Sequence, residues 1–426
     1  MRGEGRRVLF VILDGAADRP APELDGQTPL EAAETPHLDR LAENGVSGVV
    51  DIGPPGTPLP SDRAHARLFG YDPETLPRRS VFETRGLGVH VPKNGVVCSA
   101  SFARAIEEGN QWLITDRKVQ DVRDHCRDDA ALVGNFRMNG VDVSLKYTWK
   151  NRAILTATAE DGRLDPGVTD TDPFETGLPV IHPEPTNDAD DLDGARLMAE
   201  ALAAYTRWSA DRLQEGATDV VLTKWAGVRT DPEPFSEQQG LNAVSLTPKP
   251  VLAGLAETIG MNVIEPPGPH KERAEAVLKA IDTYEFVHAH YPEPDEVAHA
   301  GTPTAKRKKL EVIDASLEPV VDHTLNDPEL VTVVTADHTT PSVGNVVHSG
   351  EPVPVTITAP TVRVDAVDAA GERPAAFGGL GRVRGRDLLR LARAAADQVL
   401  LEGLRRTPHG GNVPTTNVRP LTKENL

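Results

Sequence analysis

The pattern of apolar positions predicts a buried parallel sheet. Residues 8–13 form a continuous run rich in Val, Ile and Leu that ends at an Asp-Gly pair, as expected for a strand buried on both faces. A helix is predicted next, with Thr35 as its N-cap, Pro36 in its first turn and Gly45 just past its end. A second strand is predicted at residues 48–52. The alternation of strand and helix predicts an α/β fold.

Similar strand-and-loop units occur late in the chain. Strands are predicted at residues 285–290, 330–335 and 353–359, and the first two precede the polar clusters PEPDEVAH and ADHTTP. Helices are predicted at residues 190–213 and 304–321. Because ligands bind at the carboxyl ends of parallel strands, we expect these clusters to converge although they are far apart in the sequence.

The middle of the chain has a different pattern. Residues 79–169 contain short β-like stretches, GVVCSASFA, QWLITDR and VSLKYTW, separated by polar turns. We interpret this segment as an inserted, smaller α+β cap domain. It would split a core made of residues 1–78 and 170–405, whose mainly parallel sheet is flanked by helices. Residues 406–426 are rich in Gly, Asn, Pro and Thr and are predicted to be a flexible tail.

The composition narrows the function classes. The 426 residues include 64 Asp and Glu against 45 Lys and Arg, for a net charge of −19, and the acids are spread along the whole chain. Such a surface repels phosphate backbones, so no nucleic-acid partner is expected. Lys is scarce beside Arg and aromatic residues make up 4%, which favours a halophilic protein adapted to high salt. The alternative is an ordinary acidic cytosolic protein.

The cysteines and the N-terminus bear on location. Cys98 and Cys126 lack C-x-x-C spacing, so no disulfide framework is expected. The apolar stretch at residues 8–13 is too short for a secretory signal or a membrane span. A cytoplasmic protein without a membrane partner is therefore predicted.

Four polar clusters carry the candidate chemistry. Taken singly, an Asp-Gly pair is often a turn, a Ser after Pro a helix cap, and an Asp-His pair four residues apart a surface ion pair. Together they supply seven oxygen or imidazole donors at strand ends, which suits two divalent ions, whereas a structural zinc site favours thiolates. Paired cations favour phosphoryl transfer, because they neutralise phosphate oxygens and activate the attacking oxygen. The donors are Asp14, Ser61, Asp295, His299, Asp337, His338 and His348.

Ser61 is the predicted nucleophile. Residues 61–69, SDRAHARLF, predict the start of a helix, where exposed backbone N–H groups favour a phosphate. Asp62 and His65 are candidates for contact with the substrate, although an acid also stabilises a first helical turn and His65 is as well suited to packing. His288 and His290 lie on one predicted strand, and core histidines are expected at both positions.

Four sequence motifs follow one another along the chain in a characteristic order. LDGAADRPAPELDGQTPLEAAETPHLDRLAENG opens the chain, PSDRAHARLFGYDP follows, and DEVAH and ADHTTP come later. In this order they resemble the motifs of the archaeal-type 2,3-bisphosphoglycerate-independent phosphoglycerate mutases of the alkaline phosphatase superfamily. VTDTDPFETG and the Phe82-Glu83 pair resemble positions of the family's cap. The resemblance implies an alkaline-phosphatase-like core with an inserted cap.

The resemblance also implies roles for the candidate residues. Ser61 would take the phosphoryl group of 3-phosphoglycerate and return it to the other hydroxyl of glycerate, while the cap shields the phosphoserine from water. This is an isomerase reaction of glycolysis and gluconeogenesis on a small phosphorylated metabolite. The family usually employs manganese, and the donor set is compatible with manganese or zinc. One ion would be held by Asp295, His299 and His348, and the other by Asp14, Ser61, Asp337 and His338.

Departures from the family pattern affect the substrate contacts. Pro60 stands where the family has Gly, and Lys224-Trp225-Ala226-Gly227 replaces Arg-Gly-Ala-Gly. Further arginines are absent from SASFA and DRKVQD, which replace Arg-Cys-Asn-Phe-Ala and Asp-Arg-Arg-Ala-Gly-Arg. Arg clamps a carboxylate or phosphate with two hydrogen bonds, whereas Lys offers a point charge. The remaining candidates for substrate contact are Arg79, Arg117, Lys118 and Lys224.

Three functions are therefore weighed. The first is the mutase. The second, favoured by the missing arginines, is a metal-dependent phosphatase or phosphomutase of the same superfamily that acts on another phosphorylated metabolite. The third is a non-catalytic paralogue that binds without turnover, against which the complete ligand set argues, because a purely structural role requires no such set of donors.

Overall fold

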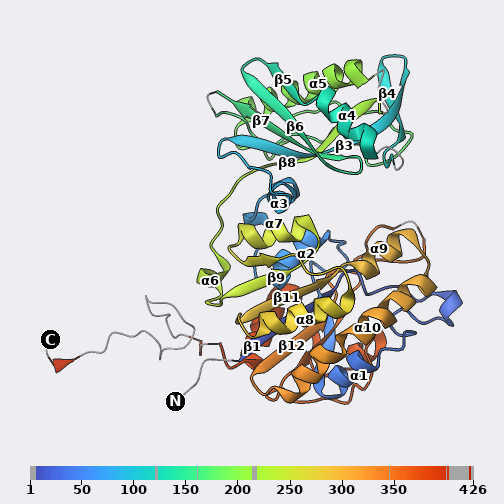
Figure 1. Cartoon of the computed structure of the whole chain (residues 1–426), viewed down its shortest axis with the longest axis vertical. Helices are drawn as coiled ribbons and strands as arrows, with labels where there is room; N and C mark the ends of the chain where they lie inside the picture. Colours follow the sequence, from blue (N-terminus) through green and yellow to red (C-terminus); the bar gives the residue numbers. More distant parts are fainter. Residues whose placement is uncertain are drawn as a thin grey trace. The chain divides into compact units, whose positions relative to one another are not determined.

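The computed structural model describes residues 6–119, 123–160, 162–213, 218–344, 346–399, 401–402 and 422–423. The chain divides into two compact units. The first combines Met1–Thr75 with Pro232–Leu426, and the second is Leu76–Asp231 (Figure 1). None of the described helices is long and apolar enough to cross a membrane.

The first unit is built on an eight-stranded sheet in the order β10-β9-β11-β1-β12-β13-β2-β14. Strand β13 runs antiparallel to both of its neighbours, and the other pairs are parallel. This confirms the predicted α/β class with a mainly parallel sheet. The strands are β1 (Arg7–Leu13), β2 (Gly45–Asp51), β9 (Ala243–Leu246), β10 (Asn262–Ile264), β11 (Phe286–Tyr291), β12 (Leu330–Thr335), β13 (Val353–Thr358) and β14 (Gly381–Arg384).

The central strands bring the predicted polar clusters to one edge of the sheet. Strand β1 is buried from Val8 onward, which explains its lack of polar positions. It pairs in parallel with β11 and β12, so Leu13 lies beside Tyr291 and Ile12 beside Thr335. The three strands therefore end together, and the segments that follow them begin at the same edge.

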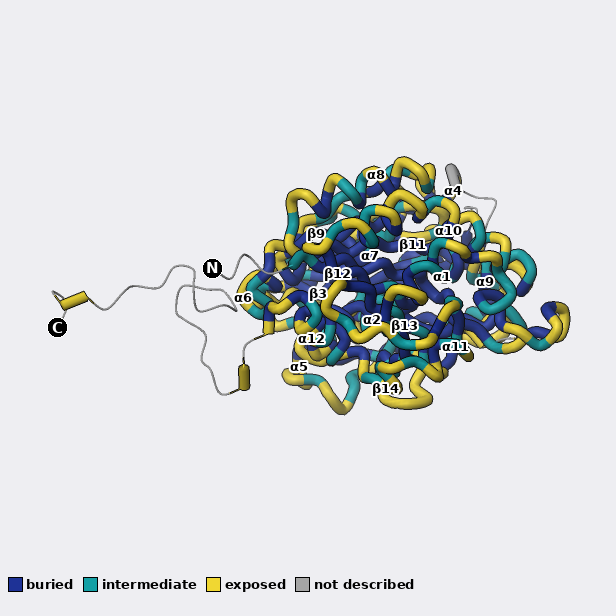
Figure 2. The backbone as a smooth tube through the Cα atoms, turned by 90° about the horizontal axis from the view of Figure 1, so that it is seen from below, coloured by how far each residue is buried: buried dark blue, intermediate teal, exposed yellow. Residues whose placement is uncertain are grey.

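Helices flank this sheet in two packed groups. Helix α10 packs against α1 and α8, while α2 packs against α7 and α12. In Figure 2 the strands β11 and β12 are dark blue, whereas the outer side of α8 is yellow. The helices are α1 (Pro36–Glu43), α2 (Ser61–Leu68), α6 (Phe235–Gln238), α7 (Pro250–Thr258), α8 (His270–Ile281), α9 (Glu293–Ala300), α10 (Pro303–Asn326), α11 (Glu372–Ala376) and α12 (Gly385–Ala395), with 3-10 turns at η1 (Pro22–Leu24) and η2 (Pro73–Thr75).

Two local predictions differ in detail from the structure. Helix α1 begins at Pro36 as predicted, but the Thr35 side chain makes no capping bond to the helix backbone, and its hydroxyl contacts Asp39 instead. Gly45 is the first residue of β2 and not a residue between helix and strand. A Cβ at Gly45 would lie 2.7 Å from the carbonyl oxygen of Leu41, so close packing requires glycine there.

The second unit contains an antiparallel sheet in the order β4-β3-β7-β6-β5, with β8 also paired to β3. The β-like stretches predicted in this segment form β3, β4 and β6. Cys98 and Cys126 are buried and unpaired in its core, as expected. The elements are α3 (Arg79–Gly86), β3 (Gly95–Glu108), β4 (Gln111–Asp116), α4 (Arg123–Leu132), β5 (Asn135–Met138), β6 (Val141–Trp149), β7 (Arg152–Ala159), α5 (Leu192–Leu213) and β8 (Val220–Val228).

The predicted cap of residues 79–169 is too short. Strand β8 pairs with β3 over residues 96–103, and α5 packs against β8, so residues 170–231 belong to the second unit and not to the core. Their sequence pattern, a helix followed by an apolar strand, is the same as that of the core, which explains the error. The predicted tail at residues 406–426 lies, apart from 422–423, outside the described residues.

Candidate metal centre

Six of the seven predicted ligands form two groups in the first unit. One group is Asp14, Asp337 and His338, and the other is Asp295, His299 and His348. Within each group the ligand atoms lie within 4.8 Å of one another.

The first group converges on the Nε2 atom of His338. Ser61 Oγ lies 3.2 Å from this nitrogen, Asp337 Oδ2 lies 3.3 Å away and Asp14 Oδ1 lies 3.4 Å away. Both carboxylate oxygens are buried and have no hydrogen-bond partner among the described residues. Because a buried anionic oxygen without a partner is destabilising, a bound cation fits between these residues.

The second oxygen of each carboxylate is held by the protein. His290 Nε2 lies 3.0 Å from Asp14 Oδ2, and the Gly15 N–H donates to Asp337 Oδ1 at 3.0 Å. The Thr247 hydroxyl lies 3.0 Å from His290 Nδ1 and also accepts the N–H of Lys249. Because Asp14 Oδ2 is a carboxylate oxygen, it accepts from His290 Nε2, and His290 Nδ1 accepts from the Thr247 hydroxyl. The ring therefore carries its proton on Nε2 and donates to Asp14, which orients the free oxygen of that carboxylate.

The tautomer of His338 is also suited to a metal. Its Nδ1 lies 3.0 Å from the Thr340 hydroxyl, which donates at 2.9 Å to Asp295 Oδ1 and therefore accepts from Nδ1–H. The lone pair on Nε2 then points at Ser61 and at the carboxylates of Asp14 and Asp337. Burial holds the pKa of His338 well below its ordinary value, which keeps the imidazole neutral.

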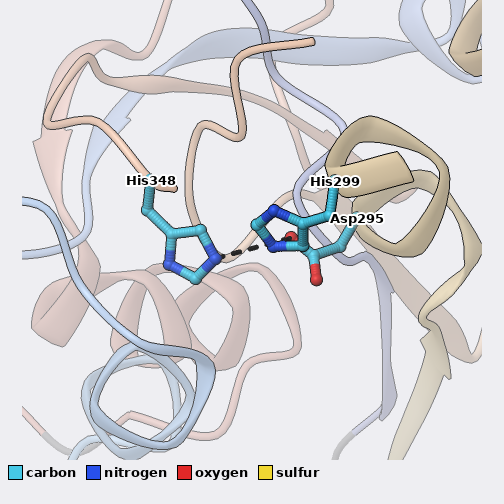
Figure 3. Close-up of side chains that lie close together, drawn as sticks. All are labelled: Asp295, His299 and His348. Carbon is cyan, nitrogen blue, oxygen red and sulfur yellow. Dashed lines mark ion pairs between the residues drawn. The ribbon is translucent and has the colours of Figure 1, made fainter. Parts of the chain in front are cut away.

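The second group is more open. Asp295 and His299 lie four residues apart on α9 and share one face, with Asp295 Oδ1 at 3.2 Å from His299 Nε2. His348 Nε2 lies 3.5 Å from the same oxygen, and its Nδ1 donates to the Leu59 carbonyl at 2.7 Å. Figure 3 shows the His348 ring reaching from a separate loop toward Asp295 and His299. The rings of His338 and His348 stack with centroids 3.8 Å apart, so the two groups adjoin.

Charge repulsion within the site favours divalent cations. Burial raises the pKa of Asp14 well above its ordinary value, and the charges of Asp337 and Asp295 raise it further. Burial also raises the pKa of Asp337. The pKa of Asp295 is lowered, because hydrogen bonds from His299 and His348 outweigh its burial. A cation between the carboxylates would relieve the repulsion and keep them ionised.

The start of α2 places the predicted nucleophile. Ser61 is the first residue of this helix, as the sequence predicted. Pro60 precedes it in an extended conformation. His65 is fully buried and donates from Nδ1 to the Ser61 carbonyl at 2.8 Å, with Asp337 Oδ2 at 3.5 Å. These contacts fit the packing role that was one of the two interpretations of His65 from the sequence. Asp62 is buried as well.

Three residues of the site were missed by sequence reasoning. Lys249 follows the short strand β9 at the same sheet edge and forms an ion pair with Glu296, and its charge partly offsets the rise in the pKa of Asp14. Lys306 is fully buried and donates to the carbonyls of Ala17 (3.1 Å) and Thr340 (2.8 Å). It thereby ties together the loops that follow β1 and β12. The third residue is Thr340 itself, since the TADHTTP motif gives no sign of its contacts.

The candidate substrate contacts Arg79, Arg117, Lys118 and Lys224 lie in the second unit. Asp172 accepts two hydrogen bonds from Arg117, at 2.7 and 2.8 Å, and one from Lys224 at 3.1 Å. Lys224 and Arg79 lie 4.8 and 5.0 Å from the ring centre of Trp225. Arg79, Arg117 and Lys224 therefore belong to one cluster, whereas Lys118 is an exposed residue next to it in sequence.

The comparisons identify the family. A model of the metalloenzyme superfamily matches residues 6–394. A 2,3-bisphosphoglycerate-independent phosphoglycerate mutase of Methanopyrus kandleri is 33% identical over 422 residues, which cover 93% of this chain and 98% of that protein. A second one, from Methanocaldococcus jannaschii, is 33% identical and covers 94% and 95% of the two chains. This chain belongs to the archaeal cofactor-independent phosphoglycerate mutase family. Membership makes it an enzyme of the isomerase class and implies divalent metal binding.

Solved structures agree with this family. A Pyrococcus horikoshii protein of 28% identity superposes with a TM-score of 0.77 and covers 94% of this chain and 100% of its own. A cofactor-independent phosphoglycerate mutase of Thermoplasma acidophilum, 25% identical, gives a TM-score of 0.64 over 92% and 100% of the two chains. The fold described above is therefore that of the family.

Proposed function

We propose that this protein interconverts 3-phosphoglycerate and 2-phosphoglycerate, without 2,3-bisphosphoglycerate, through a phosphoserine at Ser61. One observation carries the proposal. Ser61 Oγ lies 3.2 Å from His338 Nε2, in the group where Asp14 and Asp337 each present a buried oxygen without a partner. The names of the archaeal relatives support the mutase over other reactions of a phosphate-accepting serine.

Two divalent ions would serve the two ligand groups, with Asp295, His299 and His348 holding one ion. Asp14, Asp337 and His338 would hold the other, together with Ser61. Ions there would neutralise the phosphate oxygens and lower the pKa of the serine hydroxyl. Manganese is the proposed metal, because the mixed carboxylate and imidazole donors suit it.

The residues of the chain account for the remaining steps. The backbone N–H groups at the start of α2 favour a phosphate beside Ser61. Ser61 gives up its hydroxyl proton as its Oγ bonds to phosphorus, the bond from phosphorus to the 3-oxygen breaks, and the 3-oxygen takes up a proton. The 2-hydroxyl of the same glycerate then loses its proton and attacks the phosphoserine, the bond from phosphorus to Oγ breaks, and Ser61 regains a proton. Water is not consumed, so the net reaction is an isomerisation.

The test is a coupled assay of 3-phosphoglycerate conversion in high salt with Mn²⁺ and without 2,3-bisphosphoglycerate. Wild type should turn over, and Ser61→Ala should lose all phosphoryl transfer while keeping its fold. Ser316→Ala is the matched control, since the Ser316 hydroxyl bonds only within α10 to the Ile313 carbonyl in the described structure. Turnover by Ser61→Ala would exclude the serine as nucleophile.

A phosphatase or phosphomutase for another phosphorylated metabolite is the second candidate. It is supported by Lys224 and Trp225, which stand where the family motif has Arg and Gly. Release of inorganic phosphate from other phosphate esters, with no conversion of 3-phosphoglycerate, would favour it. In either case the substrate is a small phosphorylated metabolite.

The setting of the enzyme is proposed from composition and reaction. A glycolytic and gluconeogenic reaction supports a cytoplasmic location, and the net charge of −19 supports adaptation to high salt. Unfolding on transfer to low salt, followed by circular dichroism, would support that adaptation. Equal stability at low and high salt would contradict it.

A further inference from the structure

The hydroxyl of Thr340 is shared by the two ligand groups. Its Oγ1 accepts from His338 Nδ1 at 3.0 Å and donates to Asp295 Oδ1 at 2.9 Å. His338 belongs to the first group and Asp295 to the second. One hydroxyl thus fixes the imidazole tautomer in one group and the carboxylate orientation in the other.

The surroundings of Thr340 hold this hydroxyl in place. The residue is fully buried, its N–H donates to the Ala17 carbonyl at 3.0 Å, and its own carbonyl accepts from Lys306 Nζ at 2.8 Å. A Cβ at Gly15 would lie 2.4 Å from Thr340 Oγ1 and 3.0 Å from Asp295 Oδ1. The chain therefore packs tightly against both partners, and its backbone contacts do not depend on the hydroxyl.

We propose that Thr340 is a positioning residue common to both metal sites, so that loss of its hydroxyl weakens the binding of both ions. The inference rests on the proposed two-metal function. Groups that hydrogen-bond to metal ligands fix the ring tautomer and the ligand orientation, and their loss lowers metal affinity about 10- to 100-fold. The Thr340 hydroxyl contacts one ligand in each site, so its removal should lower the metal affinity of both sites.

Thr247 offers a matched comparison. Its hydroxyl lies 3.0 Å from His290 Nδ1, and His290 in turn contacts Asp14 alone among the proposed ligands in the described structure. Thr247 is also buried, and Val has the shape of Thr without the hydroxyl. Thr247→Val should therefore weaken only the site that contains Asp14.

The experiment measures each ion site separately by calorimetric titration of Mn²⁺ into the metal-free, full-length protein. His348→Gln disables the second site and leaves the first, whereas Asp14→Asn does the reverse. Thr340→Val should lower the remaining affinity at least about tenfold in both backgrounds. Thr247→Val should lower it only in the His348→Gln background. Thr340→Ser, which keeps the hydroxyl, should restore the parent affinity in both.

Controls separate positioning from folding. Thr332→Val removes another buried hydroxyl, bonded to Thr324 and away from both groups, and should leave both affinities unchanged. Circular dichroism of the metal-free proteins checks the fold, and Thr340→Ala replaces Thr340→Val if valine does not fit.

The outcomes are distinguishable. If wild type binds fewer than two ions, the two-metal function fails, and the role of Thr340 fails with it. If wild type binds two ions but Thr340→Val weakens only one site or neither, the Thr340 proposal alone is overturned. It is also overturned if Thr340→Ser binds as weakly as Thr340→Val, because the hydroxyl then does not carry the effect.

Discussion

In the first unit, Asp14 and Asp337 each bury an oxygen that has no hydrogen-bond partner among the described residues, whereas in the second unit the buried Asp172 is matched by Arg117 and Lys224. The first arrangement is destabilising unless a cation binds or a proton neutralises a carboxylate. The second is complete within the chain. Unmatched buried charge therefore distinguishes the first ligand group from this structural ion-pair cluster, although both contain buried carboxylates.

The largest expected effect comes from removing an unmatched charge. Asp337→Asn should lower the Mn²⁺ stoichiometry from two ions to one, because it removes an anionic ligand of the first group. Turnover should fall at least about 1,000-fold, since a catalytic cation contributes several kcal/mol to transition-state stabilisation. Metal analysis and the coupled assay measure the two effects.

The matched control is Asp322→Asn, at an exposed ion pair with Arg40. It should change neither stoichiometry nor turnover, because surface pairs contribute little. Two bound ions in Asp337→Asn would count against the first group as a metal site.

The first unit also contains a buried carboxylate, Asp18, that is paired with Lys306 within the chain. This pair tests how much the stability of a buried carboxylate depends on its cation partner. Lys306→Met leaves the buried Asp18 without its cation partner, and the free energy of unfolding should fall by about 3–5 kcal/mol. Urea denaturation measures the loss. Lys308→Met, at an exposed lysine of the same helix, is the control and should have little effect.

The double variant Lys306→Met/Asp18→Asn should regain part of this stability, because it removes the unpaired charge. A double variant no more stable than Lys306→Met would show that the hydrogen bonds of Lys306 to Ala17 and Thr340 matter more than its charge.

The matched carboxylate of the second unit should make stability depend on pH. Burial alone would raise the pKa of Asp172, but hydrogen bonds from Arg117 and the charge of Lys224 lower it below its ordinary 3.8. Because the pKa of Asp172 is lower in the folded protein than in the unfolded chain, its ionised carboxylate stabilises the fold at pH values above 3.8. This contribution is lost as the pH falls through the folded-state pKa.

Asp172→Asn tests this contribution. The variant should lose about 2 kcal/mol of unfolding free energy near neutral pH, as expected for hydrogen bonds to a charged group. The difference from wild type should shrink as the pH is lowered toward about 3, and the Mn²⁺ stoichiometry should stay at two. A difference that is constant with pH would show that Asp172 does not titrate as described.

The sequence predicted those parts of the site that follow from local pattern. The apolar strand before Asp14 and the helix start at Ser61 lie where expected, because both depend on residues adjacent in the chain. His290 and Thr340 act through side chains from neighbouring segments, and such contacts leave no periodic signal. Lys249 was missed because β9 has only four residues, too few for a clear strand pattern.

The domain boundary was missed for a different reason. Strand β8 has the apolar pattern of a core strand, and only its antiparallel pairing with β3 assigns it to the second unit. The partner of a strand is set by packing over long sequence distances, whereas periodicity reports only the face that a strand buries.

The smallest expected effect on stability, and the sharpest test of the second unit, is Trp225→Gly. Trp225 has a left-handed φ of 57°, its N–H is held by Asp170, and its ring lies against Arg79 and Lys224. Glycine relieves about 1 kcal/mol of backbone strain, while the lost contacts with the two cations remove about as much. The partly buried indole also packs against Phe174, so the free energy of unfolding should fall by about 1 kcal/mol in total.

Function should respond more than stability does. If the cluster of Arg79, Arg117 and Lys224 holds the anionic substrate, Trp225→Gly should change KM for 3-phosphoglycerate with little change in Mn²⁺ stoichiometry. Trp149→Ala is the control, because Trp149 also lies against two cations, Lys150 and Arg152, outside this cluster. Equal KM values for wild type, Trp225→Gly and Trp149→Ala would show that the cluster does not bind the substrate. It would then be a structural network in which Arg117 and Lys224 pair with Asp172.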